Sequence, residues 1–170
     1  MTKKLKEDES VKNTDLSSKL ITKIKFNLKT EVPEIAYKSE NIKCSKEIKV
    51  KGKKKALDEF LSAMQDLKSF FCNVCEIEHN INITKISGIS FNNNGFVLTG
   101  QICLTKNSIK SPLIINTPHI LYESKNSFAA SADVIKMLDI LKDKAVDYTN
   151  GETKDKQLPM EFDKKGKGKQ

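Results

Sequence analysis

The groups in this sequence best suited to metal or redox chemistry are two cysteines three positions apart. Cys72 and Cys75 form a CxxC motif, and His79 follows four residues later. A structural zinc site needs four ligands, and Cys44 and Cys103 could join only through folding, because there is no second CxxC or HxxxH pair. We therefore expect four reduced thiols that pack as small apolar groups. The alternative is a zinc-stabilised module.

Signatures of common enzyme classes are missing from the sequence. GxSxG, HExxH, GxGxxG and the P-loop motif GxxxxGK[ST] are all absent. Neither His79 nor His119 has a serine or cysteine partner at a known spacing. We therefore assign no catalytic residue and no metal ligand, and we expect a protein that is not an enzyme and uses no cofactor.

A lysine cluster is the main candidate for ligand binding. Five lysines lie just before a predicted helix: Lys49, Lys51, Lys53, Lys54 and Lys55. Helix N-termini attract anions, so these lysines form a candidate nucleic-acid or phosphate-binding site. Every basic residue of the chain is lysine, so a bound anion would meet point charges rather than the bidentate fork of arginine. The alternative is a solvated basic face without a ligand.

Aromatic residues give little support for base stacking. Proteins that bind single strands combine exposed aromatic side chains with basic residues. Near the lysine-rich half of the chain, only Phe26 and Tyr37 are candidates for stacking on a base. The phenylalanines of the predicted helix and strands farther along the chain occupy core-like positions. General electrostatic attraction to nucleic acid, with a strong dependence on salt, fits the sequence better.

Charge is distributed unevenly over the 170 residues, which carry a formal net charge of +8. Residues 1–55 and 151–170 are basic, whereas residues 56–150 are close to neutral. We predict a disordered basic arm over residues 1–18, a single α+β domain over 19–150 and a flexible basic tail over 151–170. No apolar run reaches the roughly 18 residues of a membrane span, and no signal-peptide pattern is visible. We therefore expect a cytoplasmic protein that does not contact membranes.

The C-terminal tail contains an isolated apolar hexapeptide, QLPMEF, at residues 157–162. Surrounded by polar sequence, it has no neighbouring core to join. The hexapeptide resembles the bacterial sliding-clamp-binding peptide QxxLxF, with Met160 in place of the usual leucine. This resemblance assigns partner binding to Gln157, Leu158, Met160 and Phe162. The alternative is a segment that folds back into a groove of its own domain.

Segments between residues 77 and 162 are similar to small bacteriophage and prophage proteins, which often lie among phage DNA-metabolism genes. The similarity rests on Ile86–Gly88, Val97–Gly100, Ser111–His119, Tyr148–Gly151 and the hexapeptide. It implies a non-catalytic phage or mobile-element accessory protein in a bacterial cytoplasm. Its partner would be a sliding clamp, another replication or recombination protein, nucleic acid, or a combination of these. An oligomer is an open alternative.

A second function also fits the lysine cluster. The protein would be an anti-defence protein that sequesters a phosphorylated nucleotide signal or inhibits a host immune effector. Lys51, Lys53, Lys54 and Lys55 would then contact the ligand.

Apolar periodicity predicts the elements that position these groups. The predicted strands and helices are Leu20–Leu28, Ile42–Val50, the helix Leu57–Phe71, Ile77–Phe91, Phe96–Leu104, Leu113–Leu121 and the helix Ala129–Tyr148. A turn-forming stretch that begins at Pro33 separates the first two strands. The order β-β-α-β-β-β-α indicates an α+β fold with an antiparallel sheet of about five strands and two helices on one face.

Four local signals refine this prediction. The last predicted helix has one apolar stripe, formed by Val134, Leu138, Leu141, Ala145 and Tyr148, and Asn150-Gly151 is its expected stop. Asn94-Gly95 is typical of a type I′ hairpin turn. The apolar alternation changes parity near Ser87-Gly88, which indicates a β-bulge. Pro112 and Pro118 bracket a segment suited to the edge of the sheet.

Overall fold

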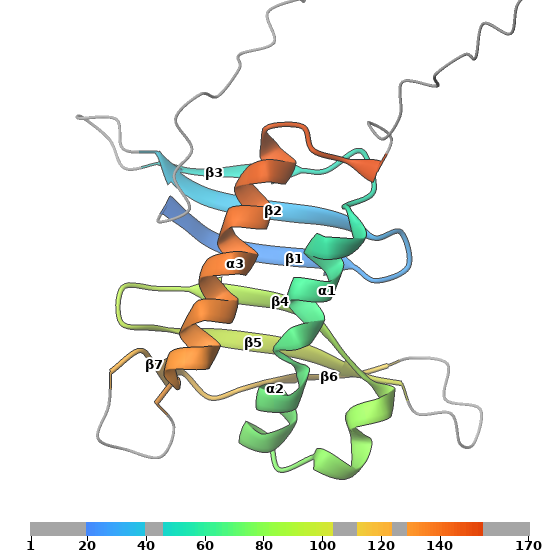
Figure 1. Cartoon of the computed structure of the whole chain (residues 1–170), viewed down its shortest axis with the longest axis vertical. Coiled ribbons are helices and arrows are strands. Elements are labelled where there is room, and N and C mark those ends of the chain that lie inside the picture. Colours follow the sequence, from blue (N-terminus) through green and yellow to red (C-terminus); the bar gives the residue numbers. More distant parts are fainter. Residues whose placement is uncertain (1–19, 40–45, 104–111, 124–128, 155–170) are drawn as a thin grey trace, which may run out of the picture.

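The computed structural model describes residues 20–39, 46–103, 112–123 and 129–154. These residues form an α+β fold in which an antiparallel sheet carries helices on one face (Figure 1). The elements are β1 (Ile21–Asn27), β2 (Val32–Ser39), β3 (Lys46–Lys51), α1 (Asp58–Asp66), α2 (Lys68–Val74), the 3-10 helix η2 (Glu78–Ile83), β4 (Thr84–Phe91), β5 (Gly95–Ile102), β6 (Leu113–Asn116), β7 (Ile120–Leu121) and α3 (Ala132–Thr149). Across the sheet the strands lie in the order β3-β2-β1-β4-β5-β6, and β7 also pairs with β5.

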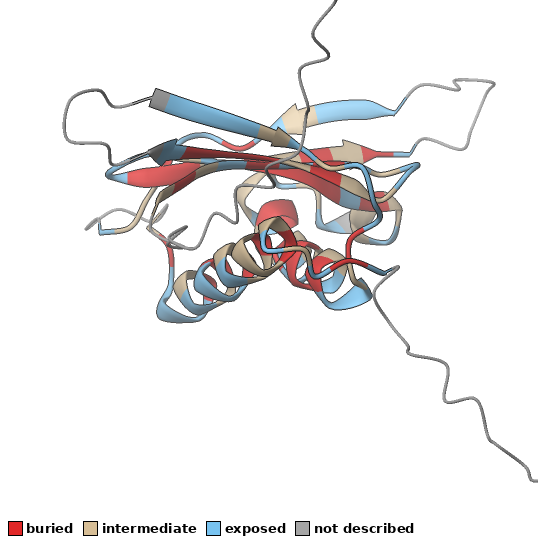
Figure 2. Cartoon of the chain, turned by 90° about the horizontal axis from the view of Figure 1, so that it is seen from above, coloured by how far each residue is buried: buried red, intermediate tan, exposed pale blue. Residues whose placement is uncertain are grey.

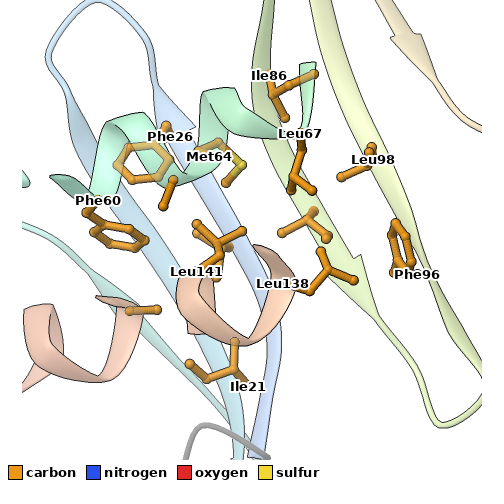
Figure 3. Close-up of a cluster of buried hydrophobic side chains, with 14 of the residues drawn as sticks. Ile21, Phe26, Phe60, Met64, Leu67, Ile86, Phe96, Leu98, Leu138 and Leu141 are labelled. Atoms are coloured by element: carbon orange, nitrogen blue, oxygen red, sulfur yellow. The ribbon is translucent and has the colours of Figure 1, made fainter. Parts of the chain in front are cut away.

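The hydrophobic core lies between the helices and one face of the sheet. Figure 2 shows α1, α2 and α3 on the same side of the strands. Figure 3 shows apolar side chains from both layers meeting there: Ile21, Phe26, Phe60, Met64, Leu67, Ile86, Phe96, Leu98, Leu138 and Leu141. The rings of Phe26 and Phe60 meet edge to face, with centroids 4.8 Å apart. In the described part of the chain, no helix covers the opposite face, which we call the uncovered face.

The final helix follows its predicted apolar stripe. Its buried residues are Val134, Leu138, Leu141, Ala145 and Tyr148. Ser131 caps the helix start by accepting a hydrogen bond from the Val134 N–H. The helix ends at Thr149, and Gly151, whose φ is 98°, lets the Glu152 N–H reach back to the Asp147 carbonyl at 3.0 Å. The predicted Asn150-Gly151 stop is therefore confirmed.

Strand β2 replaces the turn that was predicted from Pro33 onward, and that prediction was wrong. Pro33 lies near the beginning of β2, paired with Phe26, where a missing N–H costs little. The chain turns earlier, at residues 28–31, where Glu31 adopts a φ of 58°. The side-chain oxygen of Asn27 accepts hydrogen bonds from two backbone N–H groups of this turn. Strand β3 covers part of the predicted Ile42–Val50 strand, and residues 40–45 lie outside the described chain.

The predicted helix Leu57–Phe71 is divided into α1 and α2 at Leu67, so the prediction of one helix was wrong. Leu67 is fully buried and has a ψ of −3°, outside regular α-helix. After α2, Glu76 adopts a φ of 55°, and the Ile77 N–H bonds the Cys72 carbonyl at 2.8 Å. The strand predicted to begin at Ile77 begins only at Thr84, because η2 comes first. Ile77, just before η2, and Ile81 within it pack against the core.

The hairpin between β4 and β5 confirms the predicted turn position and the bulge but not the turn type. The register shifts between Ile86 and Gly88, as the parity change predicted. Neither Asn94 nor Gly95 has a positive φ, so the type I′ prediction was wrong. Instead, the side-chain oxygen of Asn92 accepts hydrogen bonds from the N–H groups of Asn94 and Gly95. Gly95 is needed because a Cβ there would overlap the backbone of β7.

The segment bracketed by prolines lies at the sheet edge, as predicted, but it is interrupted. Between β6 and β7, the hydroxyl of Thr117 accepts a hydrogen bond from the Leu98 N–H at 3.0 Å, in the position of a backbone carbonyl. The sheet therefore has seven strands rather than about five, because β2 was missed and the last predicted strand is split.

Gln65 of α1 completes the sheet where β1 ends beside β4. Its Nε2 donates to the Ile86 carbonyl at 2.8 Å, and its Oε1 accepts from the Ile86 N–H at 3.0 Å. The β1–β4 register extends only from Lys23–Ser90 to Lys25–Gly88, so it stops short of Ile86. One amide side chain therefore takes the place of a strand.

We expect Gln65→Met to destabilise the fold by about 1–3 kcal/mol, because two partly buried backbone groups lose their partner. Urea unfolding would measure the change. Ser62→Ala, an exposed position on the same helix, is the control and should change the unfolding free energy by less than about 0.5 kcal/mol. Equal effects of the two substitutions would contradict this role of Gln65.

Candidate functional site

Lysines from three neighbouring strands gather on the uncovered face. Strand register places alternate residues of β1, β2 and β3 on this side of the sheet. We call the following residues the lysine surface: Lys23, Lys25, Lys38, Lys49 and Lys51. All five are exposed. Residues far apart in the sequence therefore form one basic surface, because β2 lies between β1 and β3.

Carboxylates compensate only part of this positive charge. Glu34 and Glu47 lie on the same face by register. Glu47 is already engaged, because it accepts a hydrogen bond from the Thr22 hydroxyl at 3.0 Å and lies 3.8 Å from the Lys49 amine. Among the described residues, Lys23, Lys25 and Lys51 form no ion pair. Their charges are available to a ligand.

Among the described residues, the floor of the lysine surface contains no aromatic ring. Ala36 lies between Lys23 and Lys49 by register, and it is buried although it faces away from the helices. Phe26 and Tyr37, the two aromatic candidates from the sequence, are buried on the helix side of the sheet. They are therefore not available to stack on a base.

A pocket of about 560 Å³ opens at one end of the lysine surface. It is lined by the β1–β2 turn and by residues from both sides of the sheet: Lys25, Phe26, Asn27, Leu28, Lys29, Thr30, Val32, Pro33, Glu34, Lys51, Gly52, Gln101 and Pro112. Figure 2 shows the outer strands lying farther from the helices than the central strands. The sheet is therefore concave on its uncovered face. Lys25, Lys29 and Lys51 provide amines, and Asn27 provides an amide. The volume lies in the range of small-ligand pockets.

The predicted lysine cluster is split between the sheet and a loop. Lys49 and Lys51 belong to the lysine surface, whereas Lys53, Lys54 and Lys55 lie between β3 and α1. The Lys55 amine donates to the Glu31 carboxylate at 3.1 Å, an exposed ion pair of small energetic weight. The structure thus brings two of the five predicted lysines together with three that the cluster did not include.

The loop is fastened to the last helix. The Tyr148 hydroxyl donates to the Lys54 carbonyl at 2.6 Å, and a Cβ at Gly52 would overlap that hydroxyl. Burial raises the pKa of Tyr148. Tyr148 therefore fixes the backbone that follows β3.

The start of α1 differs from the anion site that the sequence suggested. Its first turn contains Asp58 and Glu59 rather than lysines. Carboxylates at this end are favoured by the helix dipole. The Lys154 amine contacts Asp58 at 2.8 Å, which raises the pKa of Lys154. We therefore place the basic site on the sheet and not at this helix end.

Sequence reasoning missed Lys23, Lys25 and Lys38. A signal was present for two of them, because Lys23 and Lys25 occupy polar positions of the alternating strand that contains Ile24 and Phe26. In a strand covered on one side only, polar positions point to solvent. Lys38 could not be recognised because β2 was read as a turn.

The cysteines do not all behave as buried apolar groups. Cys72 is buried, Cys75 is partly buried and Cys103 is exposed, so the prediction fails for Cys103. Burial raises the pKa of the Cys75 thiol, and neighbouring Cys72 raises it further, which disfavours a reactive thiolate. Cys44 lies outside the described residues. Within the described chain, no group of three or more His, Cys, Asp or Glu side chains could hold a metal ion.

A second pocket, of about 290 Å³, lies at the opposite end of the strands. The Lys142 amine of α3 lies 4.6 Å from the centroid of the Phe91 ring and 5.9 Å from that of Tyr122. Burial lowers the pKa of Lys142, while Asp139 and Asp143 act in the opposite direction. The aliphatic part of Lys142 and the rings of Phe91 and Tyr122 thus cover this end of the core.

The hexapeptide residues Gln157, Leu158, Met160 and Phe162 lie outside the described residues, as does the predicted arm 1–18. The described chain ends at Lys154, whose N–H bonds the Lys55 carbonyl at 3.2 Å. Clamp binding by the hexapeptide stays a prediction.

Comparison with known proteins gives no match. The chain matches no protein-family model, and searches of curated proteins and of solved structures find no significant similarity. Among the described residues, no helix is both long and apolar enough to cross a bilayer.

We expect Tyr148→Phe to lower the unfolding free energy by about 0.5–1.5 kcal/mol, the usual contribution of one hydrogen bond. Exchange of the Ala56 amide should also accelerate, because its hydrogen bond to Glu31 lies in the loop that Tyr148 holds. Urea unfolding and hydrogen exchange would measure both effects. Tyr122→Phe is the control at the other end of the sheet and should leave Ala56 exchange unchanged. Unchanged exchange in Tyr148→Phe would show that the loop is held by other contacts.

Proposed function

We propose that the protein binds the phosphate backbone of duplex nucleic acid through the lysine surface, without catalysis. The observation that carries this proposal is the set of lysines on the uncovered face, of which Lys23, Lys25 and Lys51 make no ion pair within the described chain. Each lysine that meets a phosphate releases condensed counterions, which provides most of the affinity of nonspecific binding.

Two features favour a duplex over a single strand. Single-strand binding relies on aromatic platforms, and the described residues of the lysine surface include none. The bent sheet also presents its amines over three adjacent strands, spaced about 4.8 Å apart, which suits a broad rod better than a thin strand. Phosphate contacts therefore dominate.

The side chains available favour binding that does not depend on base sequence. Arginine is the usual bidentate reader of guanine, and this chain contains none. Lysine contacts to phosphate position a protein on the duplex without reading bases. This role is compatible with the proposed accessory protein of phage DNA metabolism, whose tail would bring a sliding clamp to the same nucleic acid.

The pocket supports a second candidate function, the sequestration of a phosphorylated nucleotide. Lys25, Lys29 and Lys51 line a cavity of suitable volume, and Asn27 provides a neutral hydrogen-bonding group. Of the four lysines assigned to this function from the sequence, only Lys51 lines the pocket. The ligand would therefore be held by lysines of β1 and of the β1–β2 turn together with Lys51.

The double substitution Lys25→Gln and Lys51→Gln tests the leading proposal. We expect weaker duplex binding at low salt and a log–log salt slope smaller by about 2, because each lost phosphate contact contributes about 0.9. Fluorescence anisotropy with duplexes of unrelated sequence would measure both. Lys68→Gln with Lys136→Gln, two lysines on helices α2 and α3, is the charge-matched control and should leave the slope unchanged. Equal loss in both double variants would mean that net charge alone, rather than this surface, binds the duplex.

Cyclic and linear nucleotides test the second candidate by thermal shift and calorimetry. We expect saturable binding that Lys29→Gln weakens by about tenfold, which corresponds to about 1.4 kcal/mol. Lys29 lines the pocket at the β1–β2 turn. If nucleotides bind equally well to wild type and Lys29→Gln, the pocket is not their site.

A further inference from the structure

One half of the sheet carries almost no formal charge, in a chain where 31% of residues are charged. Residues 86–103 and 112–121 contain no Lys, Arg, Asp or Glu. They form most of β4 together with all of β5, β6 and β7. The lysine surface occupies the other half, on β1, β2 and β3. The uncovered face is therefore divided into a basic half and a second half, which we call the neutral half. The strands of the neutral half contain one charged residue, Lys85 of β4, which is exposed and pairs with Gln101.

The neutral half ends in an edge strand with exposed apolar side chains. Leu113 and Ile114 of β6 are 50% and 59% exposed. Among the described strands, β6 has a neighbour on one side only. Edge strands are normally protected from pairing by charged side chains, and the opposite edge strand β3 contains Lys49 and Lys51. The described strand β6 contains no charged side chain.

We propose that β6 pairs with β6 of a second copy of this chain. Two copies with a net charge of +8 each repel one another, so contact costs least where both surfaces are neutral. An acidic or basic partner would gain nothing electrostatically from β6, whereas an antiparallel pair of identical strands is self-complementary. Because β6 has only four residues between Pro112 and Thr117, the contact is small, and the dimer is in equilibrium with the monomer.

This pairing would create one continuous sheet of two copies. The two-fold axis of an antiparallel strand pair is perpendicular to the sheet, so both lysine surfaces face the same side. From β1 to β1 of the second copy there are seven strand spacings, which amount to about 34 Å. One turn of a B-form duplex has this length. The dimer would thus place two lysine surfaces one helical turn apart, an extension that rests on the proposed duplex binding.

Sedimentation equilibrium over a wide concentration range tests the dimer with substitutions at half-exposed isoleucines. We expect wild type to form dimers with rising concentration and Ile114→Lys to associate at least about tenfold more weakly. Ile140→Lys, on the exposed side of α3 at 54% exposure, is the matched control and should dimerise like wild type. Far-UV circular dichroism would confirm folding, and Ile114→Thr keeps a β-branched side chain if the lysine variant fails to fold. A wild type that stays monomeric, or a folded Ile114 variant that associates like wild type, would overturn the proposal.

Duplexes of one and of two helical turns test the extension. We expect Ile114→Thr, which leaves the charge of the uncovered face unchanged, to bind the short duplex like wild type and the longer one more weakly, because two linked lysine surfaces cannot both engage a single turn. Equal loss of binding to both lengths would contradict the spacing. If no duplex binds but wild type still dimerises, the proposed function fails and the β6 contact stands.

Discussion

The apolar stripes of α1, α2 and α3 cover only one face of the sheet, and this one-sided burial constrains everything else in the molecule. Residues on the helix side, such as Phe26, Leu98 and Leu141, are fully or almost fully buried. Residues that alternate with them along the strands must be polar or small, since no described helix covers the uncovered face. Packing against helices therefore does not restrict which residues occupy the uncovered face, and this face can be specialised for binding.

Charged residues are distributed unevenly over the uncovered face, and neither the fold nor the solubility of the protein requires this distribution. A solvated sheet usually mixes charges of both signs across its surface. Here lysines gather on β1, β2 and β3, whereas strands β4 to β7 contain one charged residue, Lys85. A basic half attracts a polyanion, and a neutral half allows two positively charged molecules to approach. The two proposals thus follow from one distribution of charge, and they are complementary because both halves face the same side.

Local sequence rules predicted the elements that are determined by neighbouring residues along the chain. The α3 stripe from Val134 to Tyr148, its stop at Gly151 and the bulge near Gly88 all depend on neighbouring residues only. The missed β2 shows the opposite case, because Pro33 signals a turn unless its place near the beginning of a strand beside β1 is known. The break at Leu67 and the use of Asn92 to close the hairpin depend on tertiary packing and side-chain hydrogen bonds, which periodicity does not encode.

The candidate site was predictable only in part, because its lysines come together through the order of the strands. Lys49 and Lys51 were identified from their clustering in the sequence. Lys23, Lys25 and Lys38 join them only through the sheet order β3-β2-β1, which required β2. Once β2 is in place, alternation alone assigns all five lysines to the same face. A missing strand therefore hid most of the site.

Amide chemical-shift mapping with a short duplex tests whether the lysine surface binds nucleic acid, because it reports which face is occupied without changing a residue. We expect perturbations at residues of the uncovered face on β1, β2 and β3, such as Lys25, Ala36 and Lys49, with little change along α1 and α3. Perturbations confined to the helices, or spread evenly over both faces, would contradict it.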